Sequence, residues 1–229
     1  MLRIALLSLL AGAVVATTVF PAMAASAKVP SVIAVIFEQE HTRALGNGAL
    51  LEYRFQRTVS DERLLGPAYS DEIKVGIKGD LAAGNRVVDL AVYTGERARQ
   101  FSYPDLTINP VINFFLEQSV RNFSQIAGGD TLYLKGRFKA ALRDTATVEP
   151  IEVDYDGRKV SGYRVAVRPY AGDQMAHRMQ GYDGSTFQLT VSEHVPGQVV
   201  DLVSIYTSSQ KEAPRLEERI SFAGLKGAK

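Results

Sequence analysis

Apolar and polar residues alternate along much of this 229-residue chain, which is typical of strands with one buried and one solvated face. The alternation is clearest at residues 51–56, 72–78, 88–93, 151–155, 163–168, 187–191 and 199–206, and it returns at Ile220 and Phe222. Asp156 and Gly157 form the strongest hairpin signal between two such segments. Strands and helical segments do not take turns along the chain, so the pattern predicts an antiparallel sheet.

A further apolar run at residues 32–37 is too short for its periodicity to separate strand from helix. Its β-branched residues favour a strand. The sheet is therefore expected to have eight or nine strands.

Two helical segments interrupt the strands in the middle of the chain. Asn109 suits a helix N-cap and Pro110 suits the first helical position, and apolar residues then recur at helical spacing until Gly128 ends the run. Asp130 is a candidate cap for a second helix over residues 131–143. A single helical turn is expected within residues 173–181.

These elements predict an α+β fold. The sheet should be a strongly curved antiparallel half-barrel, with the helical pair inserted after the third or fourth strand and packed on one face. A long amphipathic helix must bury its apolar stripe, and the concave side of a curved sheet offers the surface to do so.

The N-terminus has the features of a secretory signal peptide. Arg3 is the only charged residue before Lys28, an apolar stretch follows it, and Pro21 precedes a small-x-small site at residues 22–24. We predict a signal peptide over residues 1–24 and a single domain over residues 25–229. A retained membrane anchor is disfavoured, because the apolar run is near the lower limit of about 17 residues for a span. In a Gram-negative bacterium, the general secretory route would deliver this protein to the periplasm.

The amino-acid composition excludes several kinds of binding and catalysis. The formal net charge of +1 provides no electrostatic basis for binding nucleic acid. The chain has no cysteine, which excludes disulfides, thiolate metal sites and cysteine nucleophiles. Its motifs indicate no nucleotide or metal cofactor, and we expect no cofactor. The mature chain is expected to contain no transmembrane segment.

The candidate catalytic groups are few. Asp173 and His177 have i,i+4 spacing, and they would form a metal or acid–base site with His194 if the two segments met in space. Solvated or structurally hydrogen-bonded histidines are the favoured interpretation. The carboxylate pairs at residues 61–62 and 71–72 are interpreted as charged turn residues.

Two surfaces are candidates for binding. An apolar concavity under the helix of residues 110–127 would be lined by Leu90, Val92, Phe115, Leu116 and Phe123, although such residues are more often simply part of a core. The second surface is a basic line on the following helix, formed by Lys135, Lys139 and Arg143. It could contact a membrane or a partner, or it could be the ordinary solvated face of a packed helix.

A secretory signal followed by many antiparallel strands with inserted helices resembles the periplasmic carriers of outer-membrane lipoproteins. That resemblance implies an unclosed barrel whose concave face, covered by helices, holds acyl chains. It is architectural only, because the Arg-Pro-Gly element associated with those carriers is absent and Arg168 and Pro169 are followed by Tyr170. Residues 109–117, with Gly128 and Gly129 after them, also resemble uncharacterised secreted proteins of alphaproteobacteria.

Three hypotheses follow from the sequence. The leading one is a non-enzymatic periplasmic binding or carrier module for an apolar ligand such as a lipid, an acyl chain or a lipoprotein. The second is a structural or interaction protein of the cell envelope that binds another envelope protein. The third is a hydrolase or metal enzyme that uses Asp173, His177 and His194, and it requires these side chains to be neighbours in space.

Overall fold

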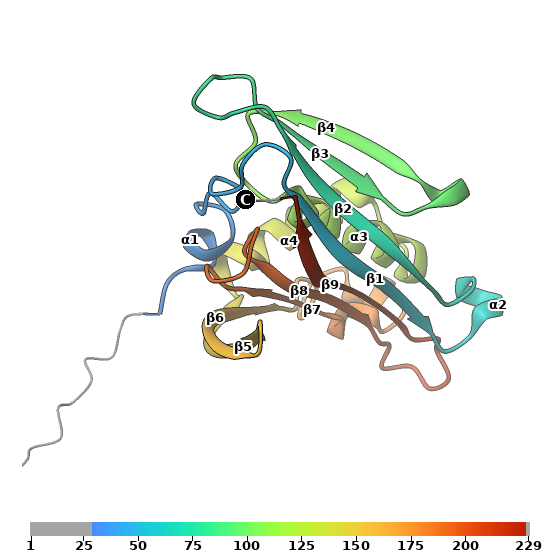
Figure 1. Ribbon diagram of the computed structural model, residues 1–229. Helices are drawn as coiled ribbons and strands as arrows, with labels where there is room; N and C mark the ends of the chain where they lie inside the picture. Colours follow the sequence, from blue (N-terminus) through green and yellow to red (C-terminus); the bar gives the residue numbers. More distant parts are fainter. Residues whose placement is uncertain (1–28, 228–229) are drawn as a thin grey trace, which may run out of the picture.

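The computed structural model describes residues 29–227 and contains a nine-stranded sheet with helices on one face (Figure 1). The strands are β1 (Leu50–Val59), β2 (Tyr69–Lys78), β3 (Val87–Val92), β4 (Arg99–Pro104), β5 (Thr147–Tyr155), β6 (Arg158–Val167), β7 (Thr186–Val191), β8 (Val199–Tyr206) and β9 (Leu216–Lys226). Their order across the sheet is β4-β3-β2-β1-β9-β8-β7-β6-β5, and all neighbours are antiparallel. Strands β4 and β5 are the two edges, so the sheet is not closed.

The helices are α1 (Val32–Ile36), α2 (Glu62–Leu65), α3 (Pro110–Ala127) and α4 (Thr131–Asp144). Three short 3₁₀ turns lie at Gly95–Arg97, Ala176–Arg178 and Tyr182–Gly184. The Asn109 side chain accepts a hydrogen bond from Val111 N at the start of α3, and Asp130 accepts one from Tyr133 N at the start of α4. Both predicted caps are therefore present.

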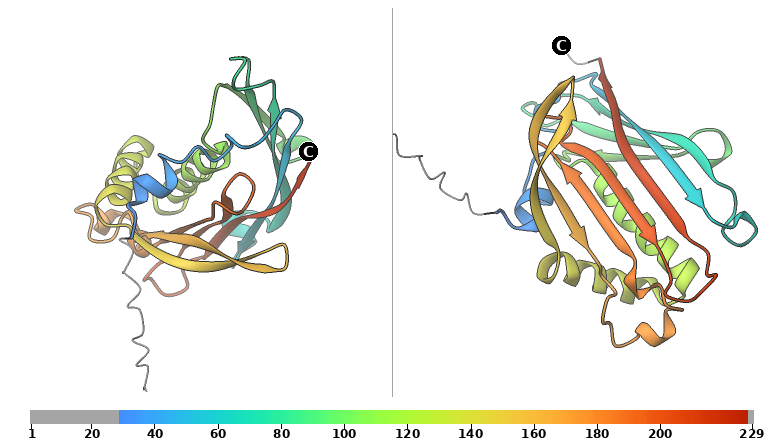
Figure 2. Two further views of the ribbon diagram at one scale, coloured as in Figure 1. Left: turned by 60° about the vertical axis from the view of Figure 1, so that its left-hand side comes forward. Right: turned by 90° about the horizontal axis from the view of Figure 1, so that it is seen from below.

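The sheet bends strongly, and α3 and α4 lie on its concave side (Figure 2). Strand β1 shows how the alternation produces this arrangement, because Leu51, Tyr53 and Phe55 are all buried while their neighbours are more exposed. Phe123 of α3 stacks on Tyr170 with 3.9 Å between ring centroids. The predicted α+β half-barrel with a helical pair on one face is confirmed, and the pair follows β4.

Two elements differ from the sequence prediction. Residues 32–37 do not form a strand, because Val32–Ile36 is the short helix α1, which is capped by Ser31 and buries Val32, Val35 and Ile36 at helical spacing. The ninth strand is instead β4, which had no prediction. Almost all of β4 is exposed, so the strand has no buried face for an alternating pattern to reveal.

The predicted signal peptide lies outside the described residues. Between residues 29 and 227, none of the helices is long and apolar enough to cross a membrane. The division into a signal peptide and a single domain over residues 25–229 stays a prediction.

Candidate functional site

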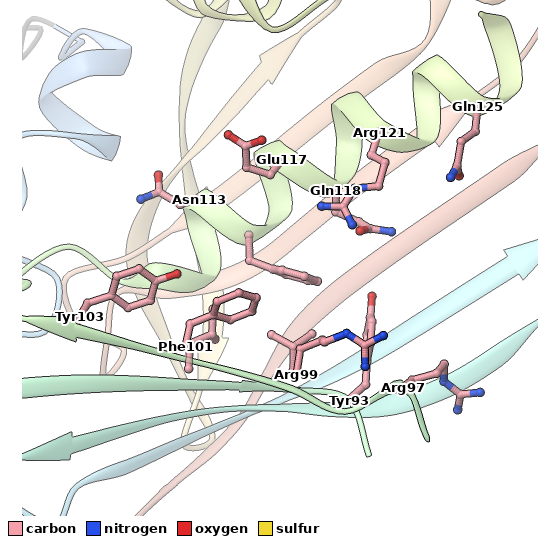
Figure 3. Close-up of a pocket in the computed structure, with 13 residues that line it drawn as sticks. Tyr93, Arg97, Arg99, Phe101, Tyr103, Asn113, Glu117, Gln118, Arg121 and Gln125 are labelled. Atoms are coloured by element: carbon pink, nitrogen blue, oxygen red, sulfur yellow. The ribbon is translucent and has the colours of Figure 1, made fainter. Parts of the chain in front are cut away.

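The groove between α3 and the β3–β4 edge of the sheet is the main candidate site (Figure 3). Its volume is about 500 Å³, within the range of small-molecule sites. Its lining residues come from three elements and the turn after β3: Leu90, Val92, Tyr93, Arg97, Arg99, Phe101, Tyr103, Asn113, Phe114, Glu117, Gln118, Arg121 and Gln125. We call this space the α3–β4 groove.

The strand wall of the α3–β4 groove follows from strand register. Leu90 of β3 is paired with Phe101 of β4, and Val92 is paired with Arg99. Because side chains alternate between the faces of a sheet, Arg99, Phe101 and Tyr103 share the face toward α3, while Gln100 lies on the opposite face. Phe101 is 44% exposed, an unusual value for a phenylalanine beside a helix.

The helix wall of the groove consists of residues spaced three or four apart along α3, so they share one face of the helix. Figure 3 shows Gln118 and Arg121 pointing from α3 toward the strands, while the Glu117 carboxylate points away from them. Glu117 pairs with Lys135 of α4 at 2.7 Å. Phe114 contacts Tyr93 edge to face, with 5.9 Å between centroids, which closes the floor between helix and sheet.

A buried ionic network fixes the second half of α3 to the sheet. Arg57 of β1 and Glu218 of β9 are register partners, and Arg57 Nη1 lies 2.5 Å from Glu218 Oε1. Asn122 of α3 donates to the other carboxylate oxygen at 2.6 Å. Burial raises the pKa of Glu218, although Arg57 and Asn122 oppose that shift. Gln118 donates to Asn122 at 3.2 Å and also lines the groove, so the network extends to the site.

A second polar cluster fixes the start of α3. The Asn109 amide donates to the Tyr53 hydroxyl at 2.7 Å and to the carbonyl of Gly197 at 2.9 Å. The backbone N–H of Asn109 donates to His41 Nδ1 at 3.4 Å. Burial lowers the pKa of His41 to about 4, so this imidazole is neutral at physiological pH. Gly197 has a φ of +71°, and a Cβ there would lie 2.4 Å from a Leu51 methyl carbon.

The edge of the groove has its own ion pair. Arg97 binds Asp71 at 3.1 Å and lies 4.3 Å above the ring of Tyr69. Burial acts to raise the pKa of Asp71, but hydrogen bonds from the Glu72 N–H, Thr94 and Arg97 outweigh it and leave that pKa below its usual range. The interpretation of Asp71 as a turn residue is wrong, because Asp71 is buried within β2.

Of the five residues predicted to line an apolar concavity, Leu90 and Val92 line the α3–β4 groove. Phe115 and Phe123 are buried in the core instead, and Leu116 is partly buried against it. The helix presents Phe114 to the groove, one position away from the predicted Phe115. The apolar residues of α3 form an amphipathic stripe, as the spacing predicts. The spacing does not show which of these residues face the core and which face the groove.

The basic line of α4 is mostly exposed to solvent. Lys139 and Arg143 are exposed, and Lys135 is partly exposed. Lys135 pairs with Glu117, and Arg143 pairs with Asp144 at 2.7 Å. Contact of this line with a membrane or a partner stays a prediction.

The groups of the enzyme hypothesis are not brought together. Asp173 follows the end of β6 and binds Tyr133 at 2.7 Å and Arg137 at 2.5 Å. His194 follows β7 and bonds Ser161 at 3.1 Å. Because Asp173 precedes β7 and His194 follows it, the two lie toward opposite ends of that strand. Within residues 29–227 there is no group of three or more histidine and carboxylate residues that could hold a metal ion.

Comparisons with known proteins found similar solved structures but no matching family model or curated sequence. No protein-family model matches the chain, and no curated protein matches it. The resemblance to alphaproteobacterial secreted proteins is therefore unsupported. Among solved structures, the MucA/MucB complex of Pseudomonas aeruginosa is similar over 82% of this chain, with 14% identity and a TM-score of 0.37. This chain spans about half of the matched chain, 53%.

A LolA-superfamily protein from Nitrosomonas europaea is similar over 87% of this chain and 94% of its own, with 12% identity and a TM-score of 0.25.

Proposed function

We propose that this protein is a non-enzymatic binding or carrier module of the periplasm and that it holds an acyl chain in the α3–β4 groove. The observation that carries the proposal is a groove of about 500 Å³ whose lining includes aromatic side chains from both β4 and α3. The exposed ring of Phe101 stands on its strand wall. Delivery to the periplasm rests on the signal peptide predicted for residues 1–24.

An apolar chain would gain most from Phe101 of β4 and Phe114 of α3, which leave apolar surface in the groove. Leu90 and Val92 also line the groove, but each is only 1% exposed. Each buried methylene contributes about 0.8 kcal/mol, which is close to a factor of four in affinity. Lengthening a saturated chain by two methylenes should therefore tighten binding by about fifteenfold until the groove is full. A saturable dependence of affinity on chain length is the thermodynamic signature of this function.

An envelope interaction protein is the second candidate, and the open edges of the sheet favour it. Strands β4 and β5 each have one side without a neighbouring strand in the sheet. An extended segment of a partner could add to such an edge through backbone hydrogen bonds. In that case the groove would take no amphiphile, and crosslinking would capture a partner at β4 or β5.

The test uses a reporter that the sequence provides, because the natural chain has no tryptophan. Phe101→Trp places one indole in the groove, and Gln100→Trp places one on the opposite face of the same strand. Titration with decanoate and dodecanoate below their micelle concentrations should shift the emission of the Phe101→Trp protein to shorter wavelength. The Gln100→Trp protein should show no shift, and the Phe101→Trp protein should bind dodecanoate about fifteenfold more tightly than decanoate.

Two outcomes would contradict the proposal. The first is no saturable shift for the Phe101→Trp protein with either chain. The second is equal shifts for both tryptophan positions, which would indicate nonspecific adsorption of the amphiphile to the protein surface.

A further inference from the structure

We infer that the ligand of the α3–β4 groove is an anionic amphiphile whose acidic group lies between Arg99 and Arg121. This inference rests on the proposed function and adds the charge of the ligand. It starts from the charges that line the groove, which are three arginines and one glutamate.

The charges of the groove fall into two groups. Arg97 is neutralised by Asp71, and Glu117 is neutralised by Lys135. Arg99 and Arg121 differ, because among the described residues neither guanidinium forms an ion pair with a carboxylate. Two positive charges in the same groove are therefore left without an acidic partner.

The bonds that Arg99 does make leave most of its donors unused. Its Nη1 donates to the carbonyl of Ala98 at 2.7 Å and, more weakly, to that of Glu96 at 3.4 Å. A guanidinium has five N–H donors in a planar fork that matches a carboxylate or phosphate. Arg99 lines the groove, two backbone carbonyls accept hydrogen bonds from one of its nitrogens, and it retains donors for an oxyanion.

The groove is polarised along its length. Strand β4 and helix α3 run in opposite directions on its two sides (Figure 3). Tyr103 and Asn113 lie at one end, Arg99 and Arg121 lie on opposite walls further along, and Arg97 and Gln125 lie at the other end. Phe101 lies between the two ends on the strand wall, where it pairs with Leu90. An amphiphile fits this order with its chain along the aromatic end and its acidic group at the basic end.

Arg99 and Arg121 also belong to different elements, one on each wall of the groove. Arg99 belongs to the sheet edge, and Arg121 belongs to the helix that the Arg57–Glu218–Asn122 network fixes in place. An acidic group that contacts both would join the two walls of the groove. Charge-assisted hydrogen bonds of this kind are about twice as strong as neutral ones.

The test compares two ligands that differ in charge. Calorimetric titration of the intact protein at pH 8 with decanoate and with decanol should show that decanoate binds at least tenfold more tightly. Arg99→Gln and Arg121→Gln should each weaken decanoate binding by roughly tenfold and leave decanol binding unchanged. Arg158→Gln is the matched control, because it removes the same charge from the start of β6, near the edge of the sheet opposite β4.

The other outcomes separate the inference from the function on which it rests. Equal binding of decanoate and decanol, unaffected by the two arginine variants, would overturn the anionic preference and leave the acyl-chain function standing. Failure of both ligands to bind would overturn both proposals. Inorganic phosphate that binds alone and blocks decanoate would show a small-anion site, which would also overturn the inference.

Discussion

The Arg57–Glu218–Asn122 network should be the most sensitive point of the helix anchor. Glu218→Leu removes the carboxylate and leaves Arg57 without its ionic partner. The side chains of Arg57 and Glu218 are only 14% and 4% exposed, so water cannot replace the lost interaction. Breaking a buried pair in this way costs about 3–5 kcal/mol in the free energy of unfolding.

The double variant Arg57→Met/Glu218→Leu separates the cost of an orphaned charge from the cost of lost packing. Replacing both members of a buried pair with apolar residues of similar size is often nearly neutral. The Asn122 amide still loses its acceptor, which costs about 1–3 kcal/mol for an unsatisfied buried group. The double variant should therefore be more stable than the single variant, with a coupling energy of at least about 1 kcal/mol.

Urea unfolding followed by circular dichroism measures these differences. Glu52→Leu is the control, because Glu52 forms an ion pair with Lys226 on the surface, where such pairs contribute about 0–1 kcal/mol. The reasoning is refuted if Glu218→Leu costs no more than Glu52→Leu, or if the double variant is as unstable as the sum of its two single variants.

Two further predictions concern the cluster at the start of α3 and the glycines. Because burial lowers the pKa of His41 from 6.5 to about 4, its contribution is complete above pH 6.5 and is lost as the pH falls toward 4. Protonation of His41 should therefore lower the free energy of unfolding by about 3 kcal/mol between pH 7 and pH 4, and His41→Asn should remove this part of the pH dependence. Urea unfolding at both pH values measures it, and an equal shift of the midpoint in the wild-type and His41→Asn proteins would contradict the prediction. Gly197→Ala should lower the free energy of unfolding by about 3 kcal/mol, because Gly197 has a left-handed φ and a Cβ there would contact Leu51 of β1. Gly136→Ala should raise the free energy of unfolding by about 1 kcal/mol, because a Cβ there meets open space and alanine favours a helix. Thermal unfolding of both variants checks the opposite signs, and equal effects would refute the argument.

The sequence predicted those parts of the fold that bury a regular pattern. Strands with one buried face, such as β1 and β2, appear as alternation, and α3 appears as a capped amphipathic stripe. Strand β4 was missed because an exposed edge strand has no pattern imposed by a core. The helix α1 was misread as a strand because five residues are too few to separate the two periods.

The site was less predictable than the fold, for a physical reason. The groove lies where the β3–β4 edge of the sheet and α3 are separated, and that separation is a tertiary property with no local signal. The sequence does contain one signal for the network that fixes α3 to the sheet. Glu218 falls in phase with the buried Leu216 and Ile220, and a carboxylate at a core position indicates a buried partner.

The most direct test of the acyl-chain proposal is native mass spectrometry of the protein isolated from the periplasm without detergent. We expect a bound mass in the lipid range that organic extraction removes. Asn113→Trp, which places a bulky ring in the groove, should reduce its occupancy, and Gln100→Trp on the opposite face of β4 should not. A wild-type protein that carries no bound mass and takes up none on incubation with dodecanoate would contradict the central claim.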